Sequence, residues 1–356
     1  MKQCNRCLFD SSFATIGEKQ CNYCDIHDEL STMYDSSDFK SVLDGIKKKG
    51  RNKKYNCLIG ISGGLDSSTL LYGAVKIWDL KPLVIHFDNG WNAPEAESNM
   101  KQLVSYLNVD SITYKVNKAE YDHLNMAFLY FGLMDADIPN DIAMTKLMYD
   151  AADKYGIKYI LNGHDFRTEG STPKGWTYMD AKYISSVYEK YSGKKLENYP
   201  LFTFNDQLIY GIKGIKQVRP FYYITNRDVI EIEMKNSIKW NDYGAKHCEN
   251  VYTEFVGSYL LPKEFEIDKR IVYISALVRS GKLKKEYAEA LFEIKGSFDS
   301  SKLGEKEKLI LDAVKHRLGV FQRSYFDRYN FKRYKFLIWL LMKLKIVPYT
   351  FYKKYT

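Results

Sequence analysis

The apolar run over residues 55–61 is followed directly by a pattern of helical period. Continuous apolar residues of this length are typical of a strand buried on both faces of a sheet. Behind the run, four apolar residues fall on one side of a helix: Leu70, Leu71, Ala74 and Val75. The first turn of this helix holds Asp66, Ser67 and Ser68, short polar residues of the kind that cap free backbone amides. The pattern therefore predicts a buried strand that passes through a turn into a helix.

Strands and helices alternate in the part of the chain that follows. Further strands are predicted at 81–87, 111–116 and 159–161, and helices at 95–107 and 141–155. This order predicts a doubly wound α/β fold, in which a mostly parallel sheet is covered by helices on both faces. The tyrosine-rich stretch from 171 to 240 predicts only short strands, at 207–210 and 217–219. Two helices separated by Ser280 and Gly281 are predicted between residues 269 and 294.

Composition narrows the class of protein without naming a partner. The 356 residues, 45% of them hydrophobic, suffice for a large core and about two domains. No run reaches the roughly 18 apolar residues of a spanning helix, and the first residues lack the pattern of a secretory signal, so a cytoplasmic protein is expected. The net charge of +9 fits a nucleic acid, a phosphate-rich small substrate or an anionic membrane surface equally well.

Four of the six cysteines form two Cys-x-x-Cys pairs near the amino terminus: Cys4, Cys7, Cys21 and Cys24. Two such pairs place four thiolates around one point, which in a cytosolic chain favours a structural zinc ion over disulfides. An iron–sulfur cluster is the alternative. Cys57 lies inside the first strand and is expected to be core, while Cys248 beside His247 is open between an ordinary and a functional thiol.

The turn after the first strand reads Ser62-Gly63-Gly64-Leu65-Asp66-Ser67-Ser68. Paired glycines let the backbone approach a phosphate closely, and the amides at the helix N-terminus then hold it. The turn lacks the lysine of a Walker A loop and the spacing of a dinucleotide fingerprint. It resembles instead the PP-loop of the ATP pyrophosphatases, which cleave ATP between the α and β phosphates. The alternative is that the glycines merely form a tight strand-to-helix turn.

Two other predicted strands end in polar clusters. The second strand is followed by Asp88-Asn89-Gly90-Trp91, and the fourth by the run 162–170, which includes Gly163, Thr168 and Glu169. In doubly wound sheets, ligands bind where the carboxyl ends of the strands meet. We therefore expect both clusters to lie near the glycine turn, with adenosine against the first of them.

Motifs outside the ATP loop give a more specific resemblance. The two Cys-x-x-Cys pairs, the loop at 62–68, the His-Phe-Asp-Asn-Gly-Trp-Asn run at 86–92 and Thr-Glu-Gly at 168–170 resemble the N-acetyl sugar amidotransferases. Further matches are Trp176, Tyr178, residues 246–249, residues 261–263 and residues 268–270. The resemblance covers most of the chain up to about residue 295. It implies an adenine nucleotide alpha hydrolase-like PP-loop domain with an amino-terminal zinc ribbon and a carboxyl-terminal helical region.

The resemblance also implies a reaction and its participants. A synthetase subunit of this kind uses ATP and Mg²⁺ to adenylate the acetamido oxygen of an activated sugar, and ammonia then replaces AMP to leave an acetamidino group, in bacterial surface polysaccharide biosynthesis. The sugar is nucleotide-linked or a nonulosonic acid. The ammonia is expected from a separate glutaminase subunit through a barrel-type subunit similar to those of histidine biosynthesis. No nucleic acid partner is implied, and Zn²⁺ is expected in the ribbon.

The resemblance assigns roles to particular residues. The expected ATP-binding residues are Ser62, Gly63, Gly64, Asp66, Ser67, Ser68, Asp88, Asn89 and Gly163. The expected catalytic residues are Asp66, Glu169, Lys246 and His247, with Asp66 as a magnesium ligand and Glu169 as a second one or a substrate contact. The expected sugar-binding residues are Trp91, Thr168, Glu169, Trp176, Lys246, Glu249, Lys263 and Arg270. For the charged residues between 240 and 270, a solvated basic surface is the alternative.

Four segments are predicted: the ribbon at 1–30, the PP-loop domain at 31–240, a substrate-binding helical subdomain at 241–330 and a basic amphipathic tail at 331–356. The tail is open between a peripheral contact with the inner face of the membrane, docking on a partner subunit and an ordinary buried helix. Two other functions remain open for the whole chain. One is a PP-loop enzyme that adenylates a tRNA base for thiolation or amidation, and the other is a zinc-bearing scaffold regulated by ATP.

Overall fold

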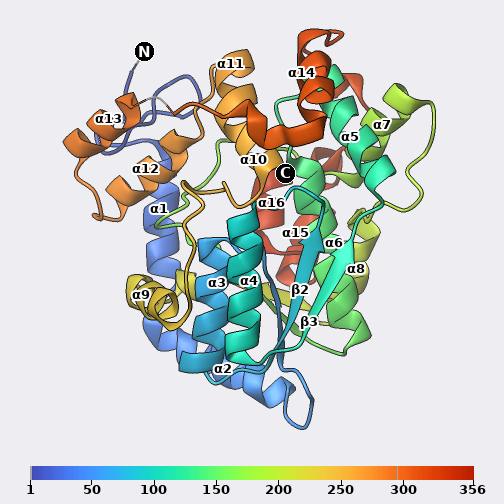
Figure 1. The fold of residues 1–356 in the computed structure, drawn as a ribbon. Coiled ribbons are helices and arrows are strands. Elements are labelled where there is room, and N and C mark those ends of the chain that lie inside the picture. Colours follow the sequence, from blue (N-terminus) through green and yellow to red (C-terminus); the bar gives the residue numbers. More distant parts are fainter. Residues whose placement is uncertain (1, 295) are drawn as a thin grey trace.

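The computed structural model describes residues 2–294 and 296–356, apart from the side chains of residues 350 and 354 (Figure 1). Its described strands form one parallel sheet of five in the order β3-β2-β1-β4-β5. The bounds are β1 Cys57–Gly60, β2 Pro82–Asp88, β3 Ser111–Lys115, β4 Tyr159–Leu161 and β5 Lys216–Val218. The strands predicted at 55–61, 81–87, 111–116, 159–161 and 217–219 are thus confirmed. The chain leaves β1 in one direction and β4 in the other, so the switch point of the sheet lies between these two strands.

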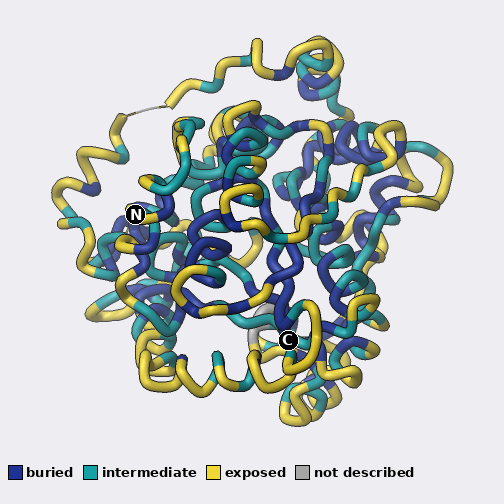
Figure 2. Tube along the Cα trace, turned by 60° about the horizontal axis from the view of Figure 1, so that its bottom comes forward, coloured by how far each residue is buried: buried dark blue, intermediate teal, exposed yellow. Residues whose placement is uncertain are grey.

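Helices cover both faces of the sheet, which confirms the doubly wound α/β fold. One face packs on α2 Ser36–Lys49, α3 Leu65–Tyr72, α4 Pro94–Leu107 and α9 Arg227–Ser237. The other packs on α6 Ile138–Lys154 and α8 Phe204–Ile212. Ile59 enters the first layer and its neighbour Leu58 the second, because successive strand residues point to opposite faces. Figure 2 shows the buried segments gathered in the middle of the molecule.

The short strand predicted at 207–210 is wrong, because these residues belong to α8. The helix begins with a capping box, in which Thr203 Oγ1 accepts a hydrogen bond from Asp206 N and the Asp206 carboxylate accepts one from Thr203 N. Gln207 and Tyr210 are buried on the same side of the helix, three positions apart. Between them Leu208 is half-buried and Ile209 is exposed, so burial along the run follows the period of a helix and not the alternation of a strand.

A second helical layer extends the core beyond the sheet edge. It contains α5 Lys118–Tyr130, α7 Ala181–Ser192, α10 Val251–Phe255, α11 Leu261–Phe265 and α14 Glu307–Lys315. Tyr121, Tyr183 and Tyr252 are almost fully buried in it. The tyrosine-rich composition of this part of the chain therefore supplies core.

The amino-terminal cysteine segment packs against helices from the other end of the sequence. The ribbon continues into α1 Asn22–Met33 and shares a core with α12 Arg270–Arg279 and α13 Lys285–Glu293, which lie beside it in Figure 1. Arg6 Nη2 donates to the carbonyl of Arg279 over 2.9 Å, and Leu8 N donates to Ser275 Oγ over 3.3 Å. The two helices predicted between 269 and 294 are confirmed as α12 and α13.

The tail forms a small cluster of its own, with α15 Lys335–Lys343 and α16 Tyr349–Tyr355 packed around Phe331, Ile338 and Val347. In α15 only Ile338 is fully buried, so this helix is not the ordinary buried terminal helix that the sequence left open. No helix in the described part of the chain has both the length and the apolar character needed to span a bilayer.

Candidate active site

The glycine turn at 62–68 lies at the switch point, between the end of β1 and the start of α3. Its hydroxyls stabilise the turn from within: Ser62 Oγ accepts a hydrogen bond from Gly64 N, and Ser67 Oγ donates one to Gly64 O, each over 3.2 Å. The amide of Leu65 donates to Tyr243 Oη over 2.7 Å. Ser68 Oγ is buried and has no partner among the described residues. The turn is therefore an ordered cradle at the edge where such sheets bind ligands.

Two glycines are required here by close approach to backbone atoms, and a third lies against a side chain. A Cβ on Gly63, whose φ is 76°, would lie 1.9 Å from the carbonyl oxygen of Ala96. A Cβ on Gly163 would lie 2.9 Å from the carbonyl oxygen of Asp66, so the loops after β1 and β4 touch through their backbones. A Cβ on Gly64 would lie 2.8 Å from the carboxyl group of Glu249. The turn thus brings together three segments that are far apart in the sequence.

Asp66 is the centre of an ion-pair network over this turn. Lys246 Nζ donates to one of its carboxylate oxygens over 2.9 Å, and Arg227 pairs with the other. Arg227 Nη1 also donates to Thr168 Oγ1 over 2.9 Å, and Lys246 Nζ lies 3.8 Å from Glu169. Burial opposes ionisation of Asp66, but Lys246 and Arg227 outweigh it and lower its pKa to about 2.

Two further carboxyl groups of the site titrate near neutral pH. Burial, with the charge of Asp66 adding to it, raises the pKa of Glu169 to about 8. Burial also raises the pKa of Glu249 to about 7. At physiological pH, Glu249 is therefore partly ionised and can accept a proton from a reacting group, whereas Glu169 is mostly protonated. Three carboxyl groups around one cradle also supply the oxygen ligands that Mg²⁺ prefers.

The two histidines at the site are neutral. Burial lowers the pKa of His164 and of His247 to about 3 each. His164 Nδ1 lies 3.0 Å from Tyr222 Oη, and its Nε2 lies 4.0 Å from Glu169. His247 has a positive φ of 67° and its ring lies against Tyr273, with centroids 5.3 Å apart. The site therefore takes its positive charge from Arg227 and Lys246.

The polar cluster after β2 is held by hydrogen bonds and packing within the protein. Asp88 accepts a hydrogen bond from Gly90 N. Asn89 is buried in a network with Tyr121, Asn140 and Asn250. Trp91 is buried against Tyr252. These contacts fix the connection between β2 and the segment at 250, and a nucleotide or sugar role for Asp88, Asn89 and Trp91 stays a prediction.

Three expected sugar contacts lie away from the cradle. Trp176 packs on Phe13 in the ribbon core, with centroids 5.2 Å apart. Lys263 is exposed and donates to Tyr259 Oη. Arg270 pairs with Asp268 and donates to the carbonyl of Phe292 at the end of α13. The structure thus brings Thr168, Glu169, Lys246 and Glu249 to the glycine turn but not these three.

Four residues lie at the site although no sequence motif predicts them there: Arg227, Tyr222, Tyr243 and Tyr273. Arg227 is the first residue of α9 and lies in a stretch with no motif. Its role follows only from the packing of α9 against α3, which places its buried side chain beside Asp66. Cys248 is buried, and burial raises the pKa of its thiol to about 11, so it stays protonated near neutral pH.

The four amino-terminal cysteines converge on one point. All are buried, and their sulfur atoms lie within 4.8 Å of one another. Four of the sulfur–sulfur distances are 3.7 or 3.8 Å. A tetrahedron of thiolates at about 2.3 Å from a central ion has edges of about 3.8 Å. The cluster can therefore hold a single metal ion.

Residues 249–354 match the family model described as "LPS biosynthesis protein WbpG-like, C-terminal domain". This part of the chain is therefore similar to a WbpG-like C-terminal domain. It begins with Glu249, whose carboxyl group lies against Gly64, and it contains Tyr273, which packs on His247. The segment that matches this family model therefore supplies part of the wall around the glycine turn.

The curated relative that matches is the uncharacterized protein MJ1599 of Methanocaldococcus jannaschii, 26% identical over 126 residues. The match covers 35% of this chain and 43% of that protein, so the chain spans less than half of its relative.

Among solved structures, the U34-tRNA thiolase NcsA of Methanococcus maripaludis has a TM-score of 0.34 and 12% identity, over 83% of this chain and 90% of that one. The NMN synthetase of Francisella tularensis has a TM-score of 0.32 and 14% identity, over 81% of this chain and 98% of that one. The NH3-dependent NAD synthetase of Campylobacter jejuni has a TM-score of 0.31 and 12% identity, over 62% of this chain and 94% of that one. At scores this low, the fold assignment rests on the observed sheet order.

Glu169→Gln is expected to stabilise the protein above neutral pH. The pKa of this carboxyl group is about 8 in the folded chain and about 4.3 in an unfolded one. Between these values the unfolded state releases the proton while the folded state keeps it, so the free energy of unfolding falls as pH rises. Glutamine has no proton to release, so it removes this fall in stability. The free energy of unfolding of the variant should exceed that of the wild type by about 1–3 kcal/mol at about pH 8 and by little at about pH 4. Urea unfolding at both pH values measures the gain, with the exposed Glu286→Gln as control. An equal gain at both pH values would contradict the assigned titration.

Proposed function

We propose that this protein is an ATP-dependent C–N ligase, the synthetase subunit of an amidotransferase that converts an acetamido sugar into an acetamidino sugar. The observation that carries the proposal is the Ser-Gly-Gly-x-Asp-Ser turn at the switch point, enclosed by Lys246, Arg227 and Glu169 and walled by a WbpG-like C-terminal domain. The backbone amides of the turn can bind a pyrophosphate, and the charged residues around it can stabilise the charge of a reaction at phosphorus.

The chemistry requires activation of a poor electrophile. The acetamido oxygen attacks the α-phosphorus of ATP, and pyrophosphate leaves toward the amides and hydroxyls of residues 62–68. Ammonia adds to the resulting O-adenylyl imidate carbon, and AMP departs with the former acetamido oxygen. Lys246 and Arg227 stabilise the negative charge that develops on the phosphates. Glu249, whose pKa of about 7 leaves it partly ionised near neutral pH, accepts the proton that ammonia loses.

Magnesium fits this site. Asp66, Glu169 and Glu249 offer oxygen ligands around the turn. Burial, with the charge of Asp66 adding to it, raises the pKa values of the two glutamates, and a bound cation would favour their ionised forms. A bound divalent ion supplies charge neutralisation for the phosphates. The same residues orient ATP, and Thr168 holds Arg227 toward Asp66.

The ammonia is proposed to come from a separate glutaminase subunit through a barrel-type subunit. Cys248, a cysteine near the site, has a protonated thiol. Ammonium salts at high concentration should replace both subunits, because the imidate reacts with free ammonia.

We further propose that the four-cysteine cluster holds zinc. A [4Fe–4S] cluster attaches each thiolate to a different iron atom, and a [2Fe–2S] cluster divides the four thiolates between two iron atoms, so either separates some of the sulfurs more widely than one tetrahedral ion does. Cys21→Ser is therefore expected to lose bound zinc and to lower the free energy of unfolding by about 3 kcal/mol or more, because the ribbon core packs around this cluster.

Metal analysis and thermal unfolding of the purified protein measure both effects. Cys57→Ser, in the strand core, is the control that should keep the zinc. A brown protein with iron and sulfide in place of zinc would contradict the metal assignment.

The reaction is tested by pyrophosphate release from ATP with ammonium chloride, comparing a panel of nucleotide-activated acetamido sugars with bulk tRNA. Release that depends on a sugar, with a product in which NH has replaced oxygen, supports the proposal. Release that depends on tRNA alone would overturn it in favour of a tRNA-modifying enzyme. ATP binding without release in either case would favour the regulatory scaffold.

A further inference from the structure

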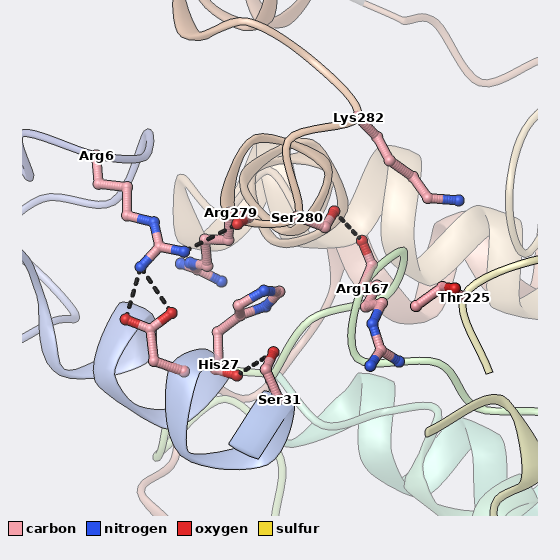
Figure 3. Close-up of a pocket in the computed structure, with 9 residues that line it drawn as sticks. Arg6, His27, Ser31, Arg167, Thr225, Arg279, Ser280 and Lys282 are labelled. Atoms are coloured by element: carbon pink, nitrogen blue, oxygen red, sulfur yellow. Dashed lines mark hydrogen bonds and ion pairs between the residues drawn. The ribbon is translucent and has the colours of Figure 1, made fainter. Parts of the chain in front are cut away.

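A basic pocket of about 430 Å³ has one wall formed by Arg167, in the loop after β4. Four cationic side chains from three segments line it: Arg6 of the ribbon, Arg167 of this loop, and Arg279 and Lys282 at and just after the end of α12 (Figure 3). Hydroxyl groups of Ser31, Thr225 and Ser280 complete the lining. Among the described lining residues, Asp28 is the one carboxylate.

Two of the arginines have close partners within the protein: the Asp165 carboxylate lies 3.9 Å from Arg167 Nη1, and Arg279 lies against the cysteine cluster. Arg167 Nη1 donates to the carbonyl oxygens of Phe221 and Tyr222, each over 3.1 Å, and neutral acceptors orient a guanidinium without cancelling its charge. Arg279 is 5% exposed, and its buried Nε has no hydrogen-bond partner among the described residues. Its Nη2 donates to Cys7 Sγ over 3.2 Å. A buried donor without a partner is costly, so a ligand that accepts its hydrogen bond is favoured.

The other two cations are partly neutralised. Arg6 pairs with Asp28 at 2.7 Å and Lys282 with Asp228 at 2.6 Å, both with half-exposed carboxylates. The pocket still has positive character at its centre, where His27 lies. Burial, together with the charges of Arg6 and Arg279, lowers the pKa of His27 to about 4.

We propose that this pocket binds the phosphate or diphosphate group of a small molecule. The cations converge on one pocket from three segments, whereas a polymer would be met by a stripe of charge along the surface. Several guanidinium donors with hydroxyl groups are the set that recognises phosphate oxygens. The pocket is also connected to the ATP site, because Thr168, next to Arg167, accepts a hydrogen bond from Arg227, which pairs with Asp66. The site does not depend on the amidotransferase reaction.

Isothermal titration tests the proposal with inorganic pyrophosphate and with UDP-N-acetylglucosamine, separately. The ATP cradle also attracts pyrophosphate, so both titrations are made with the cradle saturated by α,β-methylene-ATP. We expect binding of at least one ligand, weakened about 10-fold or more by Arg167→Met and by Lys282→Met. Arg167→Lys should retain more affinity than Arg167→Met, and Lys48→Met, exposed on α2, should change nothing.

Three results would overturn this site. One is equal affinity in the wild type and both methionine variants. Another is loss of all diphosphate binding once the cradle is filled. The third is binding of tRNA that these variants weaken while neither small ligand binds. Unchanged metal content of the variants shows that the ribbon beside the pocket is intact.

The tail carries a second, independent proposal. The outward side of α15 exposes Phe336 to 75%, Leu337 to 50%, Leu340 to 41% and Leu344, just past the helix, to 61%. The helix is fixed from behind by the buried Ile338, and Gln207 Nε2 of α8 donates to the carbonyl of Ile346. The apolar side chains are therefore presented to the outside on a supported helix, and an exposed apolar patch marks an interaction site.

Charge identifies the occupant of this face. Residues 328–356 contain no aspartate or glutamate. Exposed cations surround the apolar residues: Lys332, Arg333, Lys335, Lys343 and Lys345. Apolar and aromatic residues rimmed by lysine and arginine are suited to the interface of an anionic bilayer. We infer that α15 docks the protein on an anionic membrane surface, lying in the plane of the interface.

Co-sedimentation of the full chain with vesicles tests this. We expect binding to phosphatidylglycerol vesicles that weakens with salt and is much weaker for phosphatidylcholine alone. The double variant Phe336→Ser, Leu340→Ser should bind about 10-fold or more weakly, while Ile232→Ser, at another exposed apolar residue on α9, should bind as the wild type does. Absence of binding to the anionic vesicles, or equal binding by the double variant, would overturn the inference. So would self-association through α15 that the double variant abolishes in the absence of lipid binding.

Discussion

Replacing Lys246 with methionine is expected to lower sugar-dependent pyrophosphate release about a hundred- to a thousand-fold. Its ammonium group lies 2.9 Å from Asp66 and 3.8 Å from Glu169, over the turn that would hold the phosphates. Removing a cation from a buried site leaves the charge of the transition state unbalanced. The loss should appear in kcat as well as in kcat/KM, measured at saturating ATP.

The matched control is Lys263→Met. Lys263 lies on α11, is exposed and contacts Tyr259, so its removal should change the rate by less than about threefold. Equal losses in the two variants would show that general basic charge, rather than the ion pair at Asp66, supports the reaction. Full activity of Lys246→Met would remove this residue from the mechanism.

Gly63→Ala is expected to lower the free energy of unfolding by about 3 kcal/mol or more and to abolish ATP binding. The added Cβ would lie 1.9 Å from the carbonyl oxygen of Ala96, a backbone atom that cannot move without shifting α4. The positive φ of 76° adds strain for any residue with a Cβ. Urea unfolding and titration with ATP measure the two effects.

Gly90→Ala separates the clash from the strain. Gly90 also has a φ of 76°, but a Cβ there would meet nothing within 4 Å among the described residues. This variant should lose only about 1 kcal/mol, the cost of the left-handed conformation alone. If Gly63→Ala lowered the free energy of unfolding no more than Gly90→Ala, the loop after β1 would not be packed against α4 as described.

The sheet could be predicted from the sequence because its signals are local. Each strand is a short apolar run that ends in polar residues, and the order of strands and helices restricts the topology. The run at 207–210 was misassigned because four apolar and polar residues alone do not distinguish a strand from a helix. The capping pair Thr203 and Asp206, just outside the run, decides for the helix.

The site could be predicted only where a motif surrounds it. The turn at 62–68, Glu169 and Lys246 meet in the structure, and each lies in a short polar cluster after an apolar run or beside aromatics. Arg227 was missed because its place depends on how α9 packs against α3. Arg270 has the charge of a substrate contact, yet it joins α12 to the end of α13. Residue type shows what a side chain can bind, and only packing shows what lies within its reach.

The transfer of oxygen from the sugar to AMP tests the central claim most directly. An acetamido sugar labelled with heavy oxygen in its acetamido group is incubated with the purified protein, ATP and ammonium chloride, and the AMP is analysed by mass spectrometry. Adenylation of the acetamido oxygen predicts that the label appears in AMP and is absent from the acetamidino product. Unlabelled AMP formed during sugar turnover would contradict the account, because ATP would then be cleaved without activating that oxygen.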